Sequence, residues 1–206
     1  MTTPDDQYTT ISEKQTGEGR YSEKRSKFLA FAHHVESAED ALRLAAQYKK
    51  KYFDARHVCW AYMIGAERDI FRSNDDGEPS GTAGRPILGQ INSHGLTNIF
   101  IAVVRYFGGV KLGTSGLIVA YRTAAADAIG HALVETRIVE EVITCSFPYA
   151  ATNDVMRLVK EMHLRIINQH FDNTCHITLA IRRSLAPELR HRLDNLCENR
   201  CNTVET

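Results

Sequence analysis

The most informative stretch of this sequence is Ser73-Asn-Asp-Asp-Gly-Glu-Pro-Ser-Gly-Thr-Ala-Gly-Arg-Pro86. It contains three glycines, two prolines and three carboxylates, and it has no large aliphatic side chain. Because glycine is conformationally free and proline lacks a backbone donor, such a segment is unsuited to a helix interior or a central strand. The composition therefore predicts a loop, either elaborately ordered or disordered.

A second glycine-rich stretch follows downstream, Arg105-Tyr-Phe-Gly-Gly-Val-Lys-Leu-Gly-Thr-Ser-Gly-Leu117. It comes directly after the strongly apolar run 99–104 and before a run with helical character. Loops at the ends of core elements are where binding sites usually lie. We therefore expect the loops 73–86 and 105–116 to lie side by side and to form one cleft.

The composition of the whole chain is that of an ordinary globular protein. Its 206 residues are 43% hydrophobic and 24% charged, and its 25 basic residues balance its 25 acidic residues. This balance excludes binding of nucleic acid through overall positive charge, but it leaves room for a local basic patch. No apolar run approaches the ~20 residues of a membrane helix, and residues 1–6 do not resemble a secretory signal. We expect a cytoplasmic protein with no membrane association and with five reduced cysteines.

The first part of the chain alternates strand and helix patterns. Residues 1–20 are polar and predict a frayed or loosely docked arm. The following segments predict strands at 27–35, 58–64, 70–72, 98–106 and 134–140, and helices at 38–51, 86–95 and 117–133. The alanine-rich middle of the last helix favours close packing on a sheet.

From about residue 141 the pattern begins again. It predicts strands at 142–149, 164–170 and 176–181, and helices at 153–162 and 187–198, with a possible last strand near Val204. Strand-helix-strand-strand-helix-strand is the ferredoxin-like order. The sequence therefore predicts an α+β protein with two directly packed domains, 1–140 and 141–206.

The acidic side chains of the first loop have two interpretations. Asp75, Asp76 and Glu78 are suitable ligands for a hard cation such as magnesium, although their spacing does not fit a calcium-binding loop. The alternative is a turn in which an Asp side chain accepts backbone N–H bonds, and we expect this for at least one of them. The predicted loop motif comprises Asp75, Asp76, Gly77, Glu78, Ser80, Gly81, Thr82 and Gly84.

The second loop has features of an anion site. Gly108 and Gly113 have the outer spacing of a phosphate-binding P-loop, but Thr114 occupies the position of its lysine. Free N–H groups at a helix start still favour an anion; alternatively, Thr114 or Ser115 only caps the helix. The candidate anion or nucleic-acid contacts are Arg85, Arg105, Lys111, Gly113, Thr114, Ser115 and Gly116.

Catalytic motifs find little support. Neither Ser80 nor Ser115 lies in a complete nucleophile elbow, and Cys197 and Cys201 have no second pair with zinc-finger spacing. We predict no catalytic residue, no resident metal and no cofactor.

The two loops together resemble the IMPACT/YigZ family. The resemblance is strongest at 75–86 and 103–117, and Asp54-Ala-Arg-His57 and Lys24-Arg-Ser-Lys-Phe28 also match family segments. It extends over nearly the whole chain.

The resemblance implies a fold and a biological setting. The first domain should have the α/β sandwich fold of the second domain of a small-subunit ribosomal protein, which translational GTPases and some small-molecule kinases share. The second domain should resemble the last domain of the translocation elongation factor. Eukaryotic members inhibit a starvation-sensing translation kinase and carry an extra N-terminal domain for this interaction. Only about twenty residues precede the first family motif here, so we do not transfer that role.

Three functions remain open. The first is a translation-associated module that binds RNA or the ribosome through the contacts named above and through Lys24, Arg25 and Lys27. The second is an enzyme that acts on a phosphorylated small molecule or nucleotide at the two loops. The third is a regulator that binds a protein partner in translation through its ferredoxin-like half.

Overall fold

The computed structural model describes residues 6–197 and has the expected α+β fold. The described chain separates into two compact units. The first comprises residues 8–137, and the second comprises residues 138–197 together with Asp6 and Gln7. The sequence-based boundary at residue 140 lies close to this division, but it assigned Asp6 and Gln7 to the first domain.

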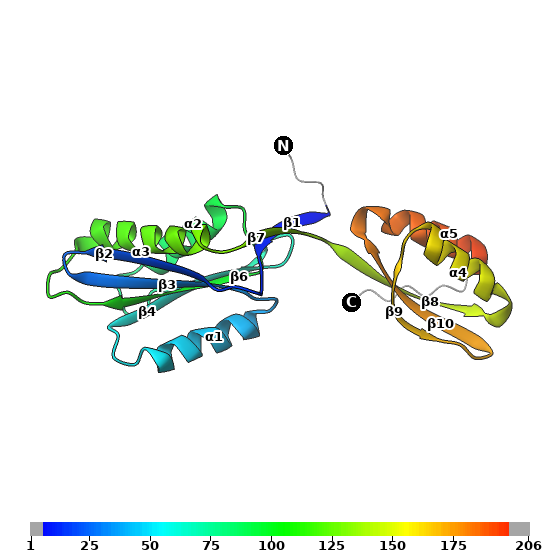
Figure 1. Ribbon diagram of the computed structural model, residues 1–206, viewed down its shortest axis with the longest axis horizontal. Coiled ribbons are helices and arrows are strands. Elements are labelled where there is room, and N and C mark those ends of the chain that lie inside the picture. The colour runs from blue at the N-terminus through cyan, green and yellow to red at the C-terminus, as the bar shows by residue number, and fades with distance from the viewer. Residues whose placement is uncertain (1–5, 198–206) are drawn as a thin grey trace. The chain divides into compact units, whose positions relative to one another are not determined.

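A five-stranded antiparallel sheet forms the centre of the first unit (Figure 1). Its order is β2-β3-β6-β4-β5, and the strands are β2 Gly17–Glu23, β3 Ser26–His34, β4 His57–Ile64, β5 Ile70–Asn74 and β6 Ile99–Tyr106. Strand β6 is central and buried on both faces, as expected from its unbroken apolar sequence. Its last buried residue, Arg105, lies opposite Phe28 of β3 and His57 of β4.

Helices cover both faces of this sheet. Helices α2 (Gly84–Ser93) and α3 (Gly113–Gly130) pack on one face, and α1 (Ala38–Lys51) packs on the other (Figure 1). Ser37 caps α1, because its Oγ accepts a 3.1 Å hydrogen bond from the Asp40 N–H. The three lysines in the last turn of α1 complement the helix dipole.

The expected N-terminal arm is wrong for the described residues. Strand β1 (Gln7–Ile11) pairs with β7 (Val134–Ile138), and β2 is an edge strand of the main sheet. The glycines of β2 are sites of close packing: a Cβ on Gly17 or Gly19 would lie 2.3 Å from the backbone of Ala128 in α3. Glycine therefore allows this strand to approach the alanine-rich helix.

The second unit has a three-stranded antiparallel sheet in the order β8-β10-β9. Its elements are β8 Glu140–Pro148, η1 Tyr149–Ala151, α4 Thr152–Glu161, β9 Arg165–His170, β10 Thr174–Arg182, η2 Arg183–Leu185 and α5 Ala186–Cys197. One face of the sheet shares an apolar core with α4 and α5. This is the ferredoxin-like arrangement through its second helix; the strand expected near Val204 lies outside the described residues.

Two helices begin earlier than predicted. Helix α2 begins at Gly84 instead of Pro86, and α3 begins at Gly113 instead of Leu117. Cys59, Cys145 and Cys175 are free and buried. Within residues 6–197, no helix has the length and hydropathy needed to cross a bilayer.

Candidate functional site

Asp75 organises the acidic loop from its side chain. Its Oδ1 accepts hydrogen bonds from the N–H groups of Ala83 (3.0 Å) and Gly84 (2.8 Å), and its Oδ2 accepts one from Gly81 (2.8 Å). These donors lie at the start of α2, where no side chain of the flanking residue caps the helix. Asp75 is therefore a cap supplied from a distant position in the loop, as the turn interpretation predicted for at least one carboxylate.

Asp76 connects the loop to α1 and β4. Its Oδ2 accepts hydrogen bonds from the Val58 N–H (2.7 Å) and from Nζ of Lys49 (2.5 Å). Its carbonyl oxygen lies 2.7 Å from Nδ1 of His57. Because these contacts engage Asp76 and those above engage Asp75, the loop offers little support for the magnesium alternative.

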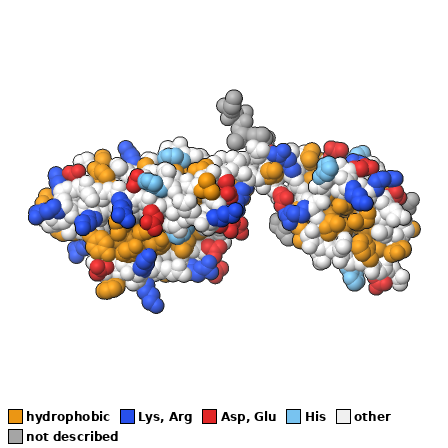
Figure 2. All heavy atoms as spheres, viewed as in Figure 1, with side chains coloured by type: hydrophobic (Ala, Val, Ile, Leu, Met, Phe, Trp, Pro, Cys, Tyr) orange, Lys and Arg blue, Asp and Glu red, His pale blue; other side chains and the backbone are white. Residues whose placement is uncertain are grey.

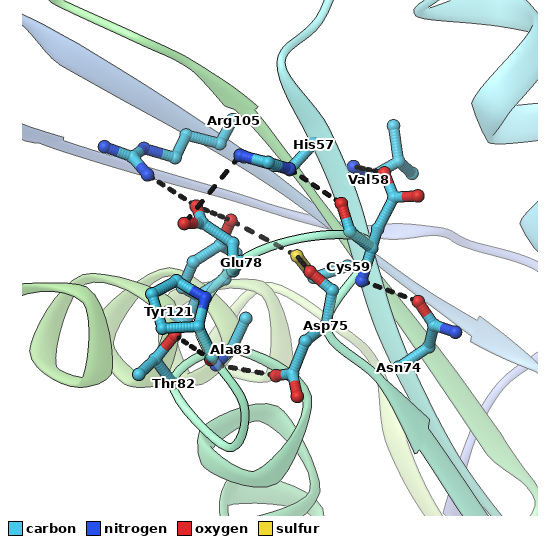
Figure 3. A network of polar contacts seen from close by, with 12 residues as sticks. His57, Val58, Cys59, Asn74, Asp75, Glu78, Thr82, Ala83, Arg105 and Tyr121 are labelled. Atoms are coloured by element: carbon cyan, nitrogen blue, oxygen red, sulfur yellow. Dashed lines mark hydrogen bonds and ion pairs between the residues drawn. The ribbon is translucent and has the colours of Figure 1, made fainter. Parts of the chain in front are cut away.

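Glu78 forms a buried ion pair with Arg105. Oε1 of Glu78 lies 2.5 Å from Nη1 of Arg105, and the two residues are only 8% and 5% exposed. The same oxygen accepts a 2.9 Å hydrogen bond from the Tyr121 hydroxyl, and Sγ of Cys59 lies 3.3 Å from that hydroxyl (Figure 3). The network thus joins the acidic loop to β4, β6 and α3.

The network keeps two of its members protonated. Burial raises the pKa of the Tyr121 hydroxyl, and the neighbouring Cys59 and Glu78 raise it further. Burial also raises the pKa of the Cys59 thiol, and the hydrogen bond with Tyr121 only partly opposes this effect. Both groups therefore remain neutral donors near neutral pH, which is appropriate beside the Glu78 carboxylate.

The second glycine-rich loop packs on the tip of the β2–β3 hairpin. A Cβ on Gly108 would lie 2.1 Å from the carbonyl carbon of Arg25, so only glycine allows this approach. The Gly108 N–H also donates a 3.1 Å hydrogen bond to Oγ of Ser26. The two residues at the tip, Lys24 and Arg25, both have left-handed backbones, with φ of 45° and 64°.

A cleft of about 600 Å³ lies between the two glycine-rich loops. Glu78 and Pro79 from the first loop line it together with the second loop, in agreement with the expectation of one shared cleft. The remaining lining residues are Arg56, His57, Arg105, Phe107, Lys111, Leu112, Gly113, Thr114 and Leu117.

A second hollow, of about 700 Å³, lies on the other side of Phe107. It is lined by Arg20, Tyr21, Ser22, Arg25, Lys27, Phe28, Leu29, Tyr106 and Phe107. The Phe107 ring is 48% exposed, and the guanidinium carbon of Arg105 lies 5.7 Å from its centroid. Figure 2 shows Lys and Arg side chains interspersed with hydrophobic ones on the first unit, at the end where the β2–β3 hairpin turns in Figure 1.

The predicted anion contacts do not all converge. Lys111, Gly113 and Thr114 line the cleft with Arg105, whereas Ser115 and Gly116 line a separate hollow beside Lys24. Arg85 lies in another hollow, with Arg122 of α3. This difference arises because α2 and α3 begin earlier than expected, so these side chains lie on helix surfaces instead of loop tips.

Neither Thr114 nor Ser115 caps α3. The flanking residue is Leu112, and no side chain accepts a hydrogen bond from the first turn at that position. The cap interpretation is therefore wrong, because both hydroxyl residues lie inside the helix.

The remaining loop-motif residues have structural roles. The Oγ1 of Thr82 donates a 2.6 Å hydrogen bond to the Pro79 carbonyl, which closes the turn around the exposed Ser80. Gly77 has a φ of 86°, and a Cβ there would lie 3.6 Å from the His57 ring. A Cβ on Gly84 would lie 2.8 Å from the Asn74 nitrogen, so glycine permits the close start of α2.

Several residues of the site are not among those predicted from the sequence. His57 and Arg56 have only the family resemblance as a signal, and Phe107 has none within the second loop. Tyr121 lies in the middle of the predicted helix, where its hydroxyl carries no local signal. The sequence offers one indication for Tyr121. Its hydroxyl lies on an apolar face of the helix, and a buried hydroxyl needs a hydrogen-bond partner.

Comparisons with known proteins agree on one family. The model of the Impact N-terminal domain matches residues 24–129. An IMPACT family member from Haemophilus influenzae is 34% identical over 160 residues, which covers 77% of this chain and 78% of that protein. The IMPACT family member YigZ from Escherichia coli is 31% identical over 174 residues, which covers 82% of this chain and 84% of that protein. A crystal structure of an hypothetical protein superposes with a TM-score of 0.73 at 25% identity and covers 98% of both chains.

Proposed function

The chain belongs to the IMPACT family, and on that premise we propose that its first unit binds single-stranded RNA of the translation machinery. The family resemblance suggests the setting in translation, and the surface chemistry around Phe107 suggests the ligand. Ribosomes are cytoplasmic, so the proposal also places the protein there. A protein partner within that machinery is compatible with this role.

The observation that carries the proposal is the position of Phe107. This half-exposed ring separates two hollows that are both lined by cationic side chains. Proteins that bind single strands combine a basic groove for the phosphates with aromatic rings on which bases stack. Tyr21 and Tyr106, which line the second hollow, supply further aromatic surface.

The cations of this surface are available to a ligand. Among the described residues, no ion pair engages the side chains that carry the positive charge here, which are Arg20, Arg25, Lys27, Arg56 and Lys111. Other cations of the first unit do form ion pairs, such as Lys49 with Asp76 and Arg43 with Asp40. An unpaired set of five around one aromatic ring favours a polyanionic ligand with planar groups.

The hairpin tip also suggests a functional constraint. A two-residue turn with both φ values positive prefers Asn-Gly or Asp-Gly, whereas this tip has Lys24-Arg25. The left-handed conformation costs a non-glycine residue about 1–2 kcal/mol. Strain of this kind is often retained where the side chains have a task, and here the turn places Arg25 beside the second hollow and Lys24 beside the hollow lined by Ser115 and Gly116.

Fluorescence anisotropy with a labelled single-stranded oligonucleotide tests the proposal. We expect affinity to fall steeply as salt rises, because each neutralised phosphate releases counterions. We also expect Arg25→Ala and Lys27→Ala to weaken binding and to reduce the salt slope by about one each. Lys160→Ala in the second unit is the matched control for charge.

The aromatic part of the proposal has its own variant. Phe107→Ala should weaken binding by about 1–3 kcal/mol, the typical contribution of a base stacked on an aromatic ring. Tyr149→Ala removes an exposed aromatic ring from the second unit and should have no effect. Binding that ignores salt, or that survives loss of the cations and Phe107 together, would overturn the proposal.

A further inference from the structure

The floor of the cleft contains two hydrogen-bond acceptors at close range. Oε2 of Glu78 lies 3.8 Å from Nε2 of His57, and both residues line the cleft. Figure 3 shows these two side chains directed toward each other from the loop and from β4. The other polar atom of each side chain, Oε1 of Glu78 and Nδ1 of His57, has a partner within the protein. These contacts indicate how Oε2 and Nε2 can bind a ligand.

The far side of Glu78 is occupied. Its Oε1 accepts from Nη1 of Arg105 and from the Tyr121 hydroxyl, whereas no described residue donates a hydrogen bond to Oε2. An ionised carboxylate is an acceptor only and has room for donors on both oxygens. Among the described residues, Oε2 is therefore an acceptor without a hydrogen-bond donor, on a side chain that lines the cleft.

The tautomer of His57 follows from its other nitrogen. Nδ1 lies 2.7 Å from the carbonyl oxygen of Asp76, and a carbonyl only accepts, so Nδ1 carries the hydrogen. In the neutral ring, Nε2 is then an acceptor. With His57 in this neutral form, the cleft presents two adjacent acceptors, which favours a ligand with two adjacent donors.

We propose that this cleft binds a guanine base of the RNA, an inference that rests on the proposed function. Guanine has the N1–H and the exocyclic N2 amine side by side on one edge. Adenine and cytosine place an amine beside a ring acceptor, and uracil flanks its one N–H with two carbonyls. Single-stranded RNA is commonly read on this base edge after the base has left the stack.

The rest of the cleft suits the same ligand. Pro79, Leu112 and Leu117 provide apolar walls, and Phe107 at the boundary with the second hollow offers a stacking surface. Thr114 and Arg105 supply donors for the guanine carbonyl, and the buried Nε of Arg105 has no acceptor within the described chain. Arg56 and Lys111 supply positive charge for the flanking phosphates.

Calorimetric titration with guanosine, inosine and adenosine monophosphates tests the base. Inosine monophosphate differs from the guanosine compound only by lacking the N2 amine. We expect the guanosine compound to bind at least about tenfold more tightly, since a hydrogen bond to a charged group contributes this much. Adenosine monophosphate should bind no better than the inosine compound.

Two variants test which residues are responsible for the preference for guanosine over inosine monophosphate. Glu78→Gln should reduce the preference for guanosine over inosine to within about twofold, provided that its far-UV circular dichroism is that of the parent. Because Glu78→Gln also alters the buried ion pair with Arg105, Thr114→Trp provides a second, independent test of the cleft. Thr114 is exposed, so the tryptophan should fill the cleft without disturbing the network and should abolish binding of the mononucleotides.

Oligonucleotides with a single guanine or a single inosine at the same position separate the two proposals. Equal, salt-sensitive binding of both would overturn the guanine site and leave the RNA surface in place. Failure of both oligonucleotides to bind would overturn the RNA surface itself. Equal affinity for the guanosine and inosine monophosphates, or guanosine binding that Thr114→Trp does not change, would also contradict the guanine site.

Discussion

Arg105 at the end of β6 and Glu78 in the acidic loop form an ion pair with an N–O distance of 2.5 Å and side-chain exposures of 6% and 3%. From the sequence, Arg105 is expected to contact an anion or nucleic acid. Its partner is instead the third carboxylate of that loop. The pair fixes the acidic loop against the sheet and shapes the floor of the cleft.

Removal of either partner should destabilise the fold strongly. We expect Arg105→Met to lower the free energy of unfolding by about 3–5 kcal/mol, because it leaves a buried charge uncompensated. The double variant Arg105→Met with Glu78→Gln should recover part of this loss. Urea unfolding of the four proteins gives the coupling energy, and simple additivity of the two changes would contradict the prediction.

The cap that Asp75 provides gives a second prediction. Asp75→Ala removes the acceptor of three backbone N–H groups at the start of α2 and should cost about 2 kcal/mol, the upper range for a lost cap. Asp75→Asn retains one acceptor oxygen and should cost less. Thermal and urea unfolding measure both, and equal stability of the alanine and asparagine variants would exclude the capping role.

Gly19 and Gly89 allow a matched test of whether close packing requires glycine. A Cβ on Gly19 would lie 2.3 Å from the Ala128 nitrogen and 2.6 Å from the Ala124 oxygen, whereas a Cβ on Gly89 would meet nothing within 4 Å. Gly19→Ala should destabilise by about 3 kcal/mol through overpacking. Gly89→Ala, within α2, should stabilise by about 1 kcal/mol. Effects of the same sign at both sites would contradict this assignment.

His33 should make the fold sensitive to mild acid. Burial, with a smaller contribution from Lys51, lowers the pKa of His33 from its ordinary value of 6.5. The unfolded chain then takes up the proton at a higher pH than the folded chain does. Stability is therefore full above about pH 6.5 and declines as the pH falls toward the lowered value.

The substitution His33→Gln isolates this effect. It retains a polar group near the Tyr48 hydroxyl, which lies 2.6 Å from Nε2 of His33. The variant should lose less stability than the parent between pH 7 and pH 5. His94→Gln at an exposed position is the control, and identical pH profiles for His33→Gln and the parent would refute the assignment.

The strained hairpin tip links stability to binding. Replacing Lys24-Arg25 with Asn-Gly should raise the free energy of unfolding by about 1–2 kcal/mol, because the left-handed backbone is then unstrained. The same change removes two cations and should weaken RNA binding. A variant that becomes more stable and binds RNA as tightly as the parent would show that the tip has no part in binding.

The sequence predicted those elements whose signals are local. The apolar run at 99–104, the capped helix after Ser37 and the strand-helix-strand-strand-helix pattern after residue 141 are all confirmed. The shared position of the two glycine-rich loops was also predictable, because loops at the same end of neighbouring elements meet. Each of these inferences depends on residues close in the chain or on the family resemblance.

The errors come from residues whose role is set by distant contacts. The polar residues 1–20 indicated a loose arm, but Gly17 and Gly19 within them are required by Ala128, more than a hundred residues away. The partner of Arg105 was one of three nearby carboxylates that are equivalent in sequence, and only tertiary packing distinguishes them. The start of α2 shifted for a similar reason, since Asp75 caps α2 from outside the helix.

The packing of Gly108 on the hairpin tip has a consequence for how the family has diverged. With the Arg25 carbonyl so close to Gly108, the length of the β2–β3 turn and the identity of residue 108 are not independent traits. Homologues with a longer turn should be released from glycine at the corresponding position, and those with a two-residue turn should retain it. Insertions at one site and side chains at the other should therefore appear together across lineages.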